Sequence, residues 1–299
     1  MSPHGSMIAP AKVNLALHVV GRRADGFHLL DTLVAFTGDG DLLEVEDGAE
    51  DDFFVSGHYA AHVPIGSGNL VTRARDLLRE TFGGDARAPV RLHLEKNLPV
   101  ASGVGGGSAD AAAALRLLAR HWDLAINETD LIRLGLRLGA DVPMCLASKP
   151  LIARGIGEAL ETLPAFPALP LVLVNPNIPL STPEVFSALE RRDNAPLPAL
   201  EDLPDAASAV RWLDGARNDL EMPARRLVPQ IEDGLGALRR AGALTARMSG
   251  SGATCFGIFS SADAAARARR ALACEHPEWF VLETETLAAE QPDADHAHP

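Results

Sequence analysis

The stretch "PVASGVGGGSADAAAALRLLA", Pro99–Ala119, places four glycines directly before a run of helix-forming residues. These glycines are Gly103, Gly105, Gly106 and Gly107. Glycine loses more backbone freedom on folding than any other residue, so ordering a cluster of glycines is costly. The cluster therefore needs a structural or functional reason.

Three interpretations compete for this glycine loop. A flexible linker fits poorly, because the loop lies between the alternating strand pattern of residues 90–94 and an alanine-rich helix pattern. Close backbone packing without a ligand stays open. In the third interpretation, consecutive N–H groups turn toward one point and the helix N-terminus adds a partial positive charge, which together favour an anion. Ser108 lies at the expected helix start, where it can cap the helix or reach a phosphate or metal.

Two common nucleotide-binding motifs do not match the loop. A Walker A loop requires Gly-Lys-Ser/Thr, and no lysine follows these glycines. The dinucleotide fingerprint G-x-G-x-x-G fails because the sixth position counted from Gly103 is Ser108. The loop alone is weak evidence, so the rest of the chain must decide.

Composition excludes some classes of partner. The chain has 299 residues and a formal net charge of −13, which disfavours binding to phosphate backbones of nucleic acids. It contains neither an apolar run of about 18 residues, which a bilayer span needs, nor an apolar signal segment at its start. Three cysteines far apart in sequence suit a reducing compartment. We expect a cytoplasmic protein without nucleic acid or membrane partners.

Helix and strand patterns are mixed in both halves without regular βαβ alternation, which favours an α+β fold. Periodicity and capping signals predict helices over 70–82, 108–122, 128–138, 218–227, 230–241 and 262–274. They predict strands over 13–19, 29–36, 42–46, 90–94 and 280–285, the first of them half-buried, and a surface loop over 193–207. The proline-rich segment "PAFPALP" marks a boundary. We expect domains over 8–166 and 167–287 and a disordered tail over 288–299.

Other motifs accompany the loop. Lys12 and Asn14 share one face of the first predicted strand, because side chains two positions apart on a strand point the same way. Asp141 follows a helix stop in "LGADVPMCL", and "SGSGATCF" forms a second glycine turn around Gly250 and Gly252. Each has an ordinary structural explanation when taken alone: a surface lysine, a strand-edge asparagine, a turn aspartate and a tight hairpin.

Taken together and in order, five motifs resemble those of the GHMP small-molecule kinases. They are "PAKVNLALHVVGRRADGFHLL", "LPVASGVGGGSADAAAAL", "LGADVPMCL", "IPLSTPEVF" and "SGSGATCF". The resemblance, from about Ala9 to Glu285, is strongest to the branch that uses ATP to phosphorylate the 2-hydroxyl of 4-diphosphocytidyl-2-C-methyl-D-erythritol in non-mevalonate isoprenoid synthesis. It implies a two-domain α+β fold, with an N-terminal mixed α/β nucleotide-binding domain and a ferredoxin-like C-terminal domain. It also implies ATP and Mg²⁺ as cofactors, and we expect a monomer or weak homodimer.

The resemblance implies that Lys12 and Asp141 form the catalytic pair. A tertiary alcohol is a poor nucleophile at neutral pH, so a positioned carboxylate accepts its proton as the bond to phosphorus forms. Lys12 beside it would orient that carboxylate and stabilise charge on the transferred phosphoryl oxygens.

The resemblance also assigns residues to the nucleotide. Ser108 is the candidate hydroxyl for Mg²⁺. The resemblance implies that Asn69, Leu70 and Lys96 lie near the adenine, although Asn69 has an alternative role as a helix cap and Lys96 as a strand-end charge. Ala101 and Ser102 depart from the family pattern, which has glycines there, and should stiffen the upstream half of the loop. The full set is Asn69, Leu70, Lys96, Pro99, Val100, Ala101, Ser102, Gly103, Val104, Gly105, Gly106, Gly107, Ser108 and Ala109.

On the substrate side, the family stacks an aromatic ring on cytosine. Phe27 stands where the family has tyrosine and keeps the stacking face, with His28 beside it to hydrogen-bond the base. The resemblance implies that Phe186 closes the other side of the ring, that Thr182 and Pro183 line the same pocket, and that Asn14 faces the methylerythritol.

Two rival functions stay open. One is another GHMP kinase acting on mevalonate-like or amino-alcohol substrates, against which "RRADGFH" argues, because only a flat base requires that segment. The other is a non-catalytic nucleotide-binding protein built on a decayed kinase, which the joint presence of Lys12, Asp141 and Ser108 disfavours.

Overall fold

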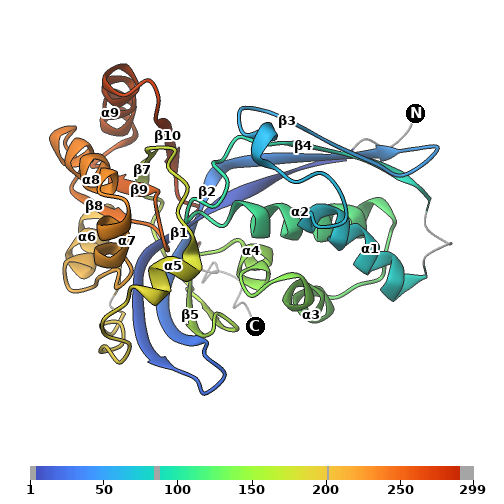
Figure 1. Ribbon diagram of the computed structural model, residues 1–299, viewed down its shortest axis with the longest axis horizontal. Coiled ribbons are helices and arrows are strands. Elements are labelled where there is room, and N and C mark those ends of the chain that lie inside the picture. Colours follow the sequence, from blue (N-terminus) through green and yellow to red (C-terminus); the bar gives the residue numbers. More distant parts are fainter. Residues whose placement is uncertain (1–4, 84–87, 201, 290–299) are drawn as a thin grey trace, which may run out of the picture. The chain divides into compact units, whose positions relative to one another are not determined.

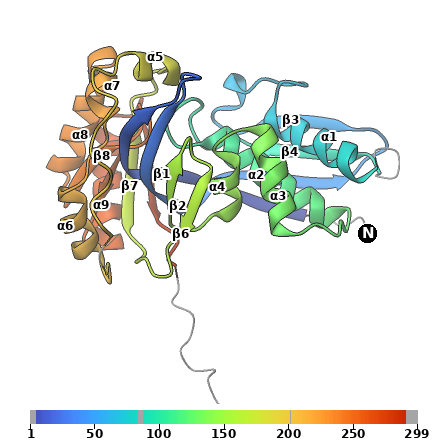
Figure 2. The same ribbon diagram turned by 90° about the horizontal axis from the view of Figure 1, so that it is seen from below.

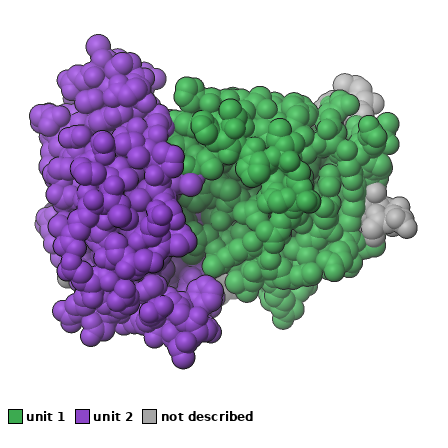
Figure 3. Space-filling model, viewed as in Figure 1, with its two compact units in different colours: residues 1–12, 39–100, 105–148 green, residues 13–38, 101–104, 149–299 purple. Residues whose placement is uncertain are grey.

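The computed structural model describes residues 5–83, 88–200 and 202–289. The chain forms two compact units (Figure 3): unit 1 contains residues 1–12, 39–100 and 105–148, and unit 2 contains residues 13–38, 101–104 and 149–299. The domains expected from the sequence, 8–166 and 167–287, stay a proposal. Residues 290–299 of the expected tail lie outside the described residues.

Unit 1 is built from strands with helices on one face, as Figures 1 and 2 show. Strand β4 pairs with β3 in parallel and with the last residues of β2 in antiparallel orientation. Its alternation is confirmed, since Val90, Leu92 and Leu94 are fully buried. The elements are β1 (Gly5–Arg22) and β2 (His28–Asp47), which both continue into unit 2, β3 (Asp52–Ser56), the 3₁₀ turn η1 (Ala60–His62), α1 (Leu70–Phe82), β4 (Val90–Glu95), α2 (Gly106–His121), α3 (Glu128–Leu138) and α4 (Val142–Ala147).

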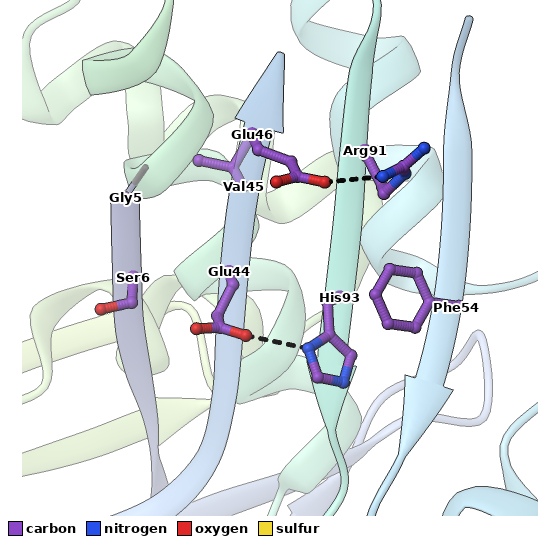
Figure 4. A pocket seen from close by; sticks show the side chains of 8 residues that line it. All are labelled: Gly5, Ser6, Glu44, Val45, Glu46, Phe54, Arg91 and His93. Carbon is purple, nitrogen blue, oxygen red and sulfur yellow. Dashed lines mark hydrogen bonds and ion pairs between the residues drawn. The ribbon is translucent and has the colours of Figure 1, made fainter. Parts of the chain in front are cut away.

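The outer face of these strands carries paired charges. Glu44 lies 2.8 Å from the His93 ring and Glu46 lies 2.9 Å from Arg91, each across two neighbouring strands. The ring of Phe54 stacks on His93 with centroids 4.3 Å apart. These side chains line a surface pocket of about 260 Å³ (Figure 4). Because each charged side chain in its lining is paired with a neighbour, we assign the pocket a structural role.

Local capping signals explain the helix boundaries of unit 1. Helix α1 begins and ends as predicted. The Asn69 side chain fixes its start by accepting a hydrogen bond from the Val71 N–H at 2.8 Å, and Gly83 follows its end with a φ of 98°. Helix α3 also matches its predicted range, 128–138. Helix α2 begins at Gly106, two residues before the predicted start, because Gly105 adopts a left-handed conformation (φ 66°) and serves as the N-cap. Ser108 therefore lies in the first turn of α2 and does not cap it.

Unit 2 contains an antiparallel sheet with the strand order β10-β7-β9-β8. Helix α8 packs against β8 and β9, and α9 packs against β7 and β10. This strand order, with one helix before β8 and one after β9, is the ferredoxin-like arrangement expected for the C-terminal part. The elements are β5 (Leu151–Gly155), β6 (Ala159–Thr162), β7 (Pro170–Asn175), α5 (Thr182–Ser187), α6 (Ala206–Asp214), α7 (Glu221–Leu227), α8 (Gln230–Arg240), β8 (Thr245–Met248), β9 (Cys255–Ile258), α9 (Ala262–Glu275) and β10 (Phe280–Glu285).

The first strand differs from its prediction. The alternation over residues 13–19 predicted a half-buried strand, but all seven residues are buried. His18 is completely buried, with one ring nitrogen 3.0 Å from the Ala195 carbonyl and the other accepting the Arg217 N–H. Burial lowers the pKa of His18, so the neutral ring is favoured there. Backbone groups of two segments far along the chain, at Ala195 and Arg217, therefore contact the side chain that the alternation assigns to solvent.

No helix among residues 5–83, 88–200 and 202–289 has the length and apolar character needed to cross a bilayer.

Gly40 gives a test of how the strands of unit 1 pack. A Cβ atom on Gly40 would lie 2.6 Å from the carbonyl carbon of Ala9 and 2.9 Å from Cα of Pro10. We expect Gly40→Ala to lower the free energy of unfolding by about 1–3 kcal/mol, the usual range for overpacking. Gly68→Ala is the control, because a Cβ there meets no atom within 4 Å. Urea denaturation of both variants provides the measurement, and equal effects would contradict the packing described here.

Candidate active site

Lys12 and Asp141, which lie 129 positions apart, form an ion pair in unit 1. The ammonium of Lys12, on β1, lies 2.8 Å from Oδ2 of Asp141, in the turn between α3 and α4. The Lys12 side chain is 8% exposed, whereas that of Asp141 is 41% exposed. The pair therefore has a buried cation and a carboxylate that a ligand can reach.

The electrostatics of the pair keep Lys12 charged. Burial alone would lower the pKa of the Lys12 ammonium, but the charge of Asp141 and its hydrogen bond outweigh that effect and raise it. A lysine that stays protonated while buried supplies a fixed positive charge beside an accessible carboxylate. This combination suits a reaction in which an alcohol loses a proton next to a developing negative charge.

The downstream half of the glycine loop lies against this lysine. A Cβ atom on Gly105 would come 3.0 Å from Cε and 3.2 Å from Cβ of Lys12, so only glycine lets the chain pass there with a φ of 66°. The first backbone hydrogen bond of α2 runs from the Ala109 N–H to the Gly105 carbonyl. The N–H groups of residues 106–108 therefore have no acceptor within the helix and are available to an anion.

Gly106 and Gly107 differ in their surroundings. A Cβ atom on Gly106 would lie 3.0 Å from the ammonium of Lys96, which explains that glycine by packing. At Gly107 the nearest atom among the described residues is Cδ1 of Leu70, 3.9 Å away, so the protein itself leaves room for a side chain. Gly107 is exposed in the first turn of α2. The described protein leaves this glycine without a steric reason, and a bound ligand would provide one.

Lys96 is enclosed by two carboxylates. Its ammonium lies 2.5 Å from Oδ2 of Asp41 and 2.6 Å from Oδ2 of Asp110, and its side chain is 3% exposed. Burial lowers the pKa of Lys96, but the two carboxylates outweigh it and raise that pKa. Burial raises the pKa of Asp110 to about 7 against the opposing charge of Lys96. The prediction that Lys96 lies near adenine stays a prediction, since its ammonium is paired with the two carboxylates.

The predicted adenine residues Asn69 and Leu70 lie at the start of α1. The Asn69 side chain caps this helix, and its Nδ2 donates to the Pro64 carbonyl at 3.0 Å, so the alternative role as a cap is the one observed. Leu70 opens the helix and is partly exposed.

The upstream half of the loop, residues 101–104, belongs to unit 2 and packs on the second glycine turn. Ser249 Oγ donates to the Gly103 carbonyl at 2.9 Å, and a Cβ on Gly103 would lie 2.8 Å from the Gly252 nitrogen. Ala101, where the family has glycine, adopts a positive φ of 51°. Residues 101–104 of the first glycine-rich motif therefore pack with the second glycine turn within unit 2.

The predicted substrate residues of unit 2 form two contacts. The rings of His28 and Phe186 stack with centroids 4.7 Å apart, whereas Phe27 is 59% exposed. The pairing of Phe27 with Phe186 around a base stays a prediction, because the ring that lies on Phe186 is His28. The Thr182 hydroxyl lies 2.8 Å from the Ser251 hydroxyl, and Pro183 follows in the first turn of α5.

Two of the predicted substrate residues in unit 2 each have a buried atom without a hydrogen bond among the described residues: Oδ1 of Asn14 and Nε2 of His28. The Asn14 side chain is anchored through Nδ2, which donates to Thr32 at 2.8 Å. Burial lowers the pKa of His28, with Arg22 and Arg192 adding to the effect, so a neutral ring is favoured. Buried polar atoms are normally satisfied, so both atoms are candidates for contact with a polar ligand.

The sequence reasoning missed Asp41 and Asp110. Asp41 shares the inward face of β2 with Leu43 and Val45, and Asp110 lies among the buried alanines of α2. A single carboxylate in an otherwise apolar row is the signal that marks each of them. Their common partner is not visible in the sequence, because Lys96 lies 55 positions from Asp41.

A buried lysine paired with an accessible carboxylate, beside a glycine loop that opens a helix, suits phosphoryl transfer to a small alcohol. The models "GHMP kinases N terminal domain" and "GHMP kinases C terminal" match residues 69–149 and 196–278. The 4-diphosphocytidyl-2-C-methyl-D-erythritol kinase of Mesorhizobium japonicum is 56% identical over 282 residues, covering 94% of this chain and 96% of that protein.

Solved structures agree with this match. The crystal structure of a 4-(cytidine 5'-diphospho)-2C-methyl-D-erythritol kinase superposes with a TM-score of 0.78 at 36% identity, covering 95% of this chain and all of that one. The homoserine kinase of Cytophaga hutchinsonii, at 18% identity and a TM-score of 0.69, covers 97% and 96% and shows the shared fold. The chain belongs to the 4-diphosphocytidyl-2-C-methyl-D-erythritol kinase family of the GHMP kinases.

Gly105→Ala tests the contact between the loop and Lys12. The added Cβ strains a left-handed residue by about 1–2 kcal/mol and also pushes against the Lys12 stem. Because small displacements of catalytic groups are costly, we expect kinase turnover to fall by at least about tenfold. Gly242→Ala is the matched control, since its φ is 92° and its Cβ meets nothing within 4 Å. Comparable stability losses with turnover lost only in Gly105→Ala support the contact, and equal turnover in both variants refutes it.

Proposed function

We propose that this chain transfers the γ-phosphoryl group of ATP to the 2-hydroxyl of 4-diphosphocytidyl-2-C-methyl-D-erythritol. The observation that carries the proposal is the Lys12–Asp141 ion pair of 2.8 Å, held against Gly105 where α2 begins. Membership of the kinase family supports the choice of reaction and substrate.

Asp141 acts as the general base in this proposal. Its Oδ2 is held by Lys12, and the exposure of its side chain leaves Oδ1 accessible to the alcohol proton. As that proton moves to Asp141, the alcohol oxygen bonds to the γ-phosphorus and the bond to the bridging oxygen breaks, releasing ADP. General-base help of this kind contributes about 10²–10⁴-fold to a rate.

Lys12 and the start of α2 act on the phosphates. The Lys12 ammonium stabilises the charge that grows on the transferred phosphoryl oxygens. The N–H groups of residues 106–108 point from a helix N-terminus, which attracts anions, and the space at Gly107 lets a phosphate approach the backbone.

The residues present fit a magnesium ion that relies mainly on ATP for its ligands. Among the described residues no group of three or more His, Cys, Asp or Glu side chains is placed to hold a metal. Mg²⁺ in kinases commonly takes few protein ligands together with phosphate oxygens and water. The hydroxyl of Ser108, half-buried in the first turn of α2, would be the protein ligand. When bound, the ion neutralises negative charge on the phosphates.

The nucleoside part of the substrate is assigned to unit 2. The stacked rings of His28 and Phe186 and the exposed ring of Phe27 offer flat apolar surface to cytosine. In this proposal His28 Nε2, which has no hydrogen-bond partner among the described residues, forms a hydrogen bond with the base. Asn14 Oδ1, which also has none, accepts a hydrogen bond from a hydroxyl of the methylerythritol. Thr182 and Pro183 line the same pocket in this proposal.

We also propose that the protein works in the cytoplasm, as a monomer or weak homodimer and without nucleic acid. The net charge of −13 supports the last point, because phosphate backbones are repelled by such a surface.

A substrate comparison tests the proposed reaction. Purified protein with Mg-ATP is offered 4-diphosphocytidyl-2-C-methyl-D-erythritol, mevalonate or homoserine, and ADP release is followed. We expect kcat/KM to be at least about 100-fold higher for the cytidine compound, because only that substrate fills the nucleoside contacts. Preferential phosphorylation of mevalonate or homoserine would overturn the substrate assignment, and no phosphorylation of any of them would favour a non-catalytic nucleotide-binding protein.

Asp141→Asn tests the proposed base. The amide has the shape of the carboxylate but does not accept the proton, so turnover should fall by about 10²–10⁴-fold while both ligands still bind. Asp76→Asn, which neutralises an exposed carboxylate on α1, is the control and should leave turnover unchanged. Calorimetric titration checks ligand binding, and near-normal turnover of Asp141→Asn would remove this residue from the mechanism.

A further inference from the structure

The buried ion network around Lys96 joins three segments of unit 1. Asp41 lies on β2, Lys96 follows the end of β4, and Asp110 lies on α2. The ammonium of Lys96 is within 2.6 Å of both carboxylates. All three residues are buried, with exposed fractions of 6% or less for their side chains. None of them has a role in the transfer step described above.

Asp41 also holds the backbone that leads into the glycine loop. Its Oδ1 accepts the N–H groups of Asn97 and Leu98 at 2.6 and 2.8 Å. Asp41 therefore fixes the loop entrance through its backbone and fixes Lys96 through a charge. Lys96 in turn forms an ion pair with Asp110, which lies one turn into α2. The first N–H groups of this helix are those proposed above to bind the phosphates.

The network also lies directly against the loop. A Cβ on Gly106 would be 3.0 Å from the Lys96 ammonium and 3.6 Å from Oδ2 of Asp41. The first residue of α2 thus rests on the network without an intervening side chain. Since one cation faces two carboxylates, the charge of the network does not attract a nearby triphosphate. Any contribution of the network to ATP binding must therefore come from the position it gives to the loop and the helix start.

We propose that the Lys96–Asp41–Asp110 network positions the start of α2 for ATP, and that these three are positioning residues of the kinase. The short contacts of the Lys96 ammonium with both carboxylates restrict how the three segments can shift, whereas an apolar contact permits sliding, so the network sets the helix start relative to the loop entrance. The proposal rests on the proposed function, because it assumes that the start of α2 binds the phosphates of ATP.

The test separates positioning from stability. The double variant K96M/D110N removes the cation together with one of its carboxylates, so Asp41 keeps its two backbone hydrogen bonds. The KM for ATP and the KM for 4-diphosphocytidyl-2-C-methyl-D-erythritol are measured in one steady-state assay, with the melting temperature alongside. We expect the KM for ATP to rise at least about tenfold while the KM for the other substrate stays within about twofold.

Asp47→Asn is the control, since it neutralises an exposed carboxylate on the same strand as Asp41 and should change neither KM. If the double variant does not fold, Asp110→Asn alone is measured, because its amide oxygen still faces Lys96. For that variant we expect a rise of at least about threefold in the ratio of the two KM values. An unchanged or lower ratio in the folded variant, with or without a lower melting temperature, overturns the proposal. Failure of the proposed function is distinguishable, because the wild-type protein would then not phosphorylate the cytidine compound in the same assay.

Discussion

The ion pair between Lys12 and Asp141 is the interaction on which the site depends. It requires a buried ammonium on β1 and a carboxylate in the turn between α3 and α4 to meet at 2.8 Å across 129 positions of sequence. The burial of Lys12 is tolerated because Asp141 raises its pKa against the effect of desolvation. The pair in turn requires Gly105, since a side chain there would occupy the space of the lysine stem.

The glycine cluster has several causes rather than one. Gly103 is required by the second glycine turn of unit 2, Gly105 by its left-handed backbone and by Lys12, and Gly106 by the buried Lys96. Packing without a ligand therefore explains three of the four glycines in the loop. Gly107 differs, because its surroundings among the described residues leave space, and this is where a phosphate can approach the backbone. Packing is therefore confirmed for three of the glycines, and the anion interpretation stays a prediction for Gly107.

The sequence predicted elements whose ends are determined locally. Helices α1 and α3 were placed correctly because Asn69 and Asn127 cap them through their own side chains. Features that depend on distant segments were missed. The burial of His18 comes from residues near 195 and 217, and helix α6 begins inside a segment that its proline and aspartate content marked as a loop. The start of α2 was misplaced by two residues because an N-cap glycine in the left-handed conformation resembles ordinary loop sequence.

The site could be predicted only in part for the same reason. Family motifs led to the pairing of Lys12 with Asp141, which the geometry of unit 1 contains. The environment of Lys96 could not be obtained in this way. Asp41 belongs to none of the motifs, Asp110 lies in the glycine-loop motif without an assigned role, and both meet Lys96 only in the folded unit. A lysine after a strand end, such as Lys96, fits either a surface charge or a ligand contact by its sequence alone. The burial of its side chain in the folded unit excludes the role of a surface charge.

A double-mutant cycle on Lys12 and Asp141 tests the central claim most directly. Phosphoryl transfer is measured in single-turnover experiments for the wild type, Lys12→Met, Asp141→Asn and the double variant, at ligand concentrations that saturate each protein. Groups that act as one unit are strongly non-additive, so the account predicts a double variant no more than about tenfold slower than the slower single variant. If the two rate losses instead multiply in the double variant, the residues act independently and the ion pair is not the centre of the reaction.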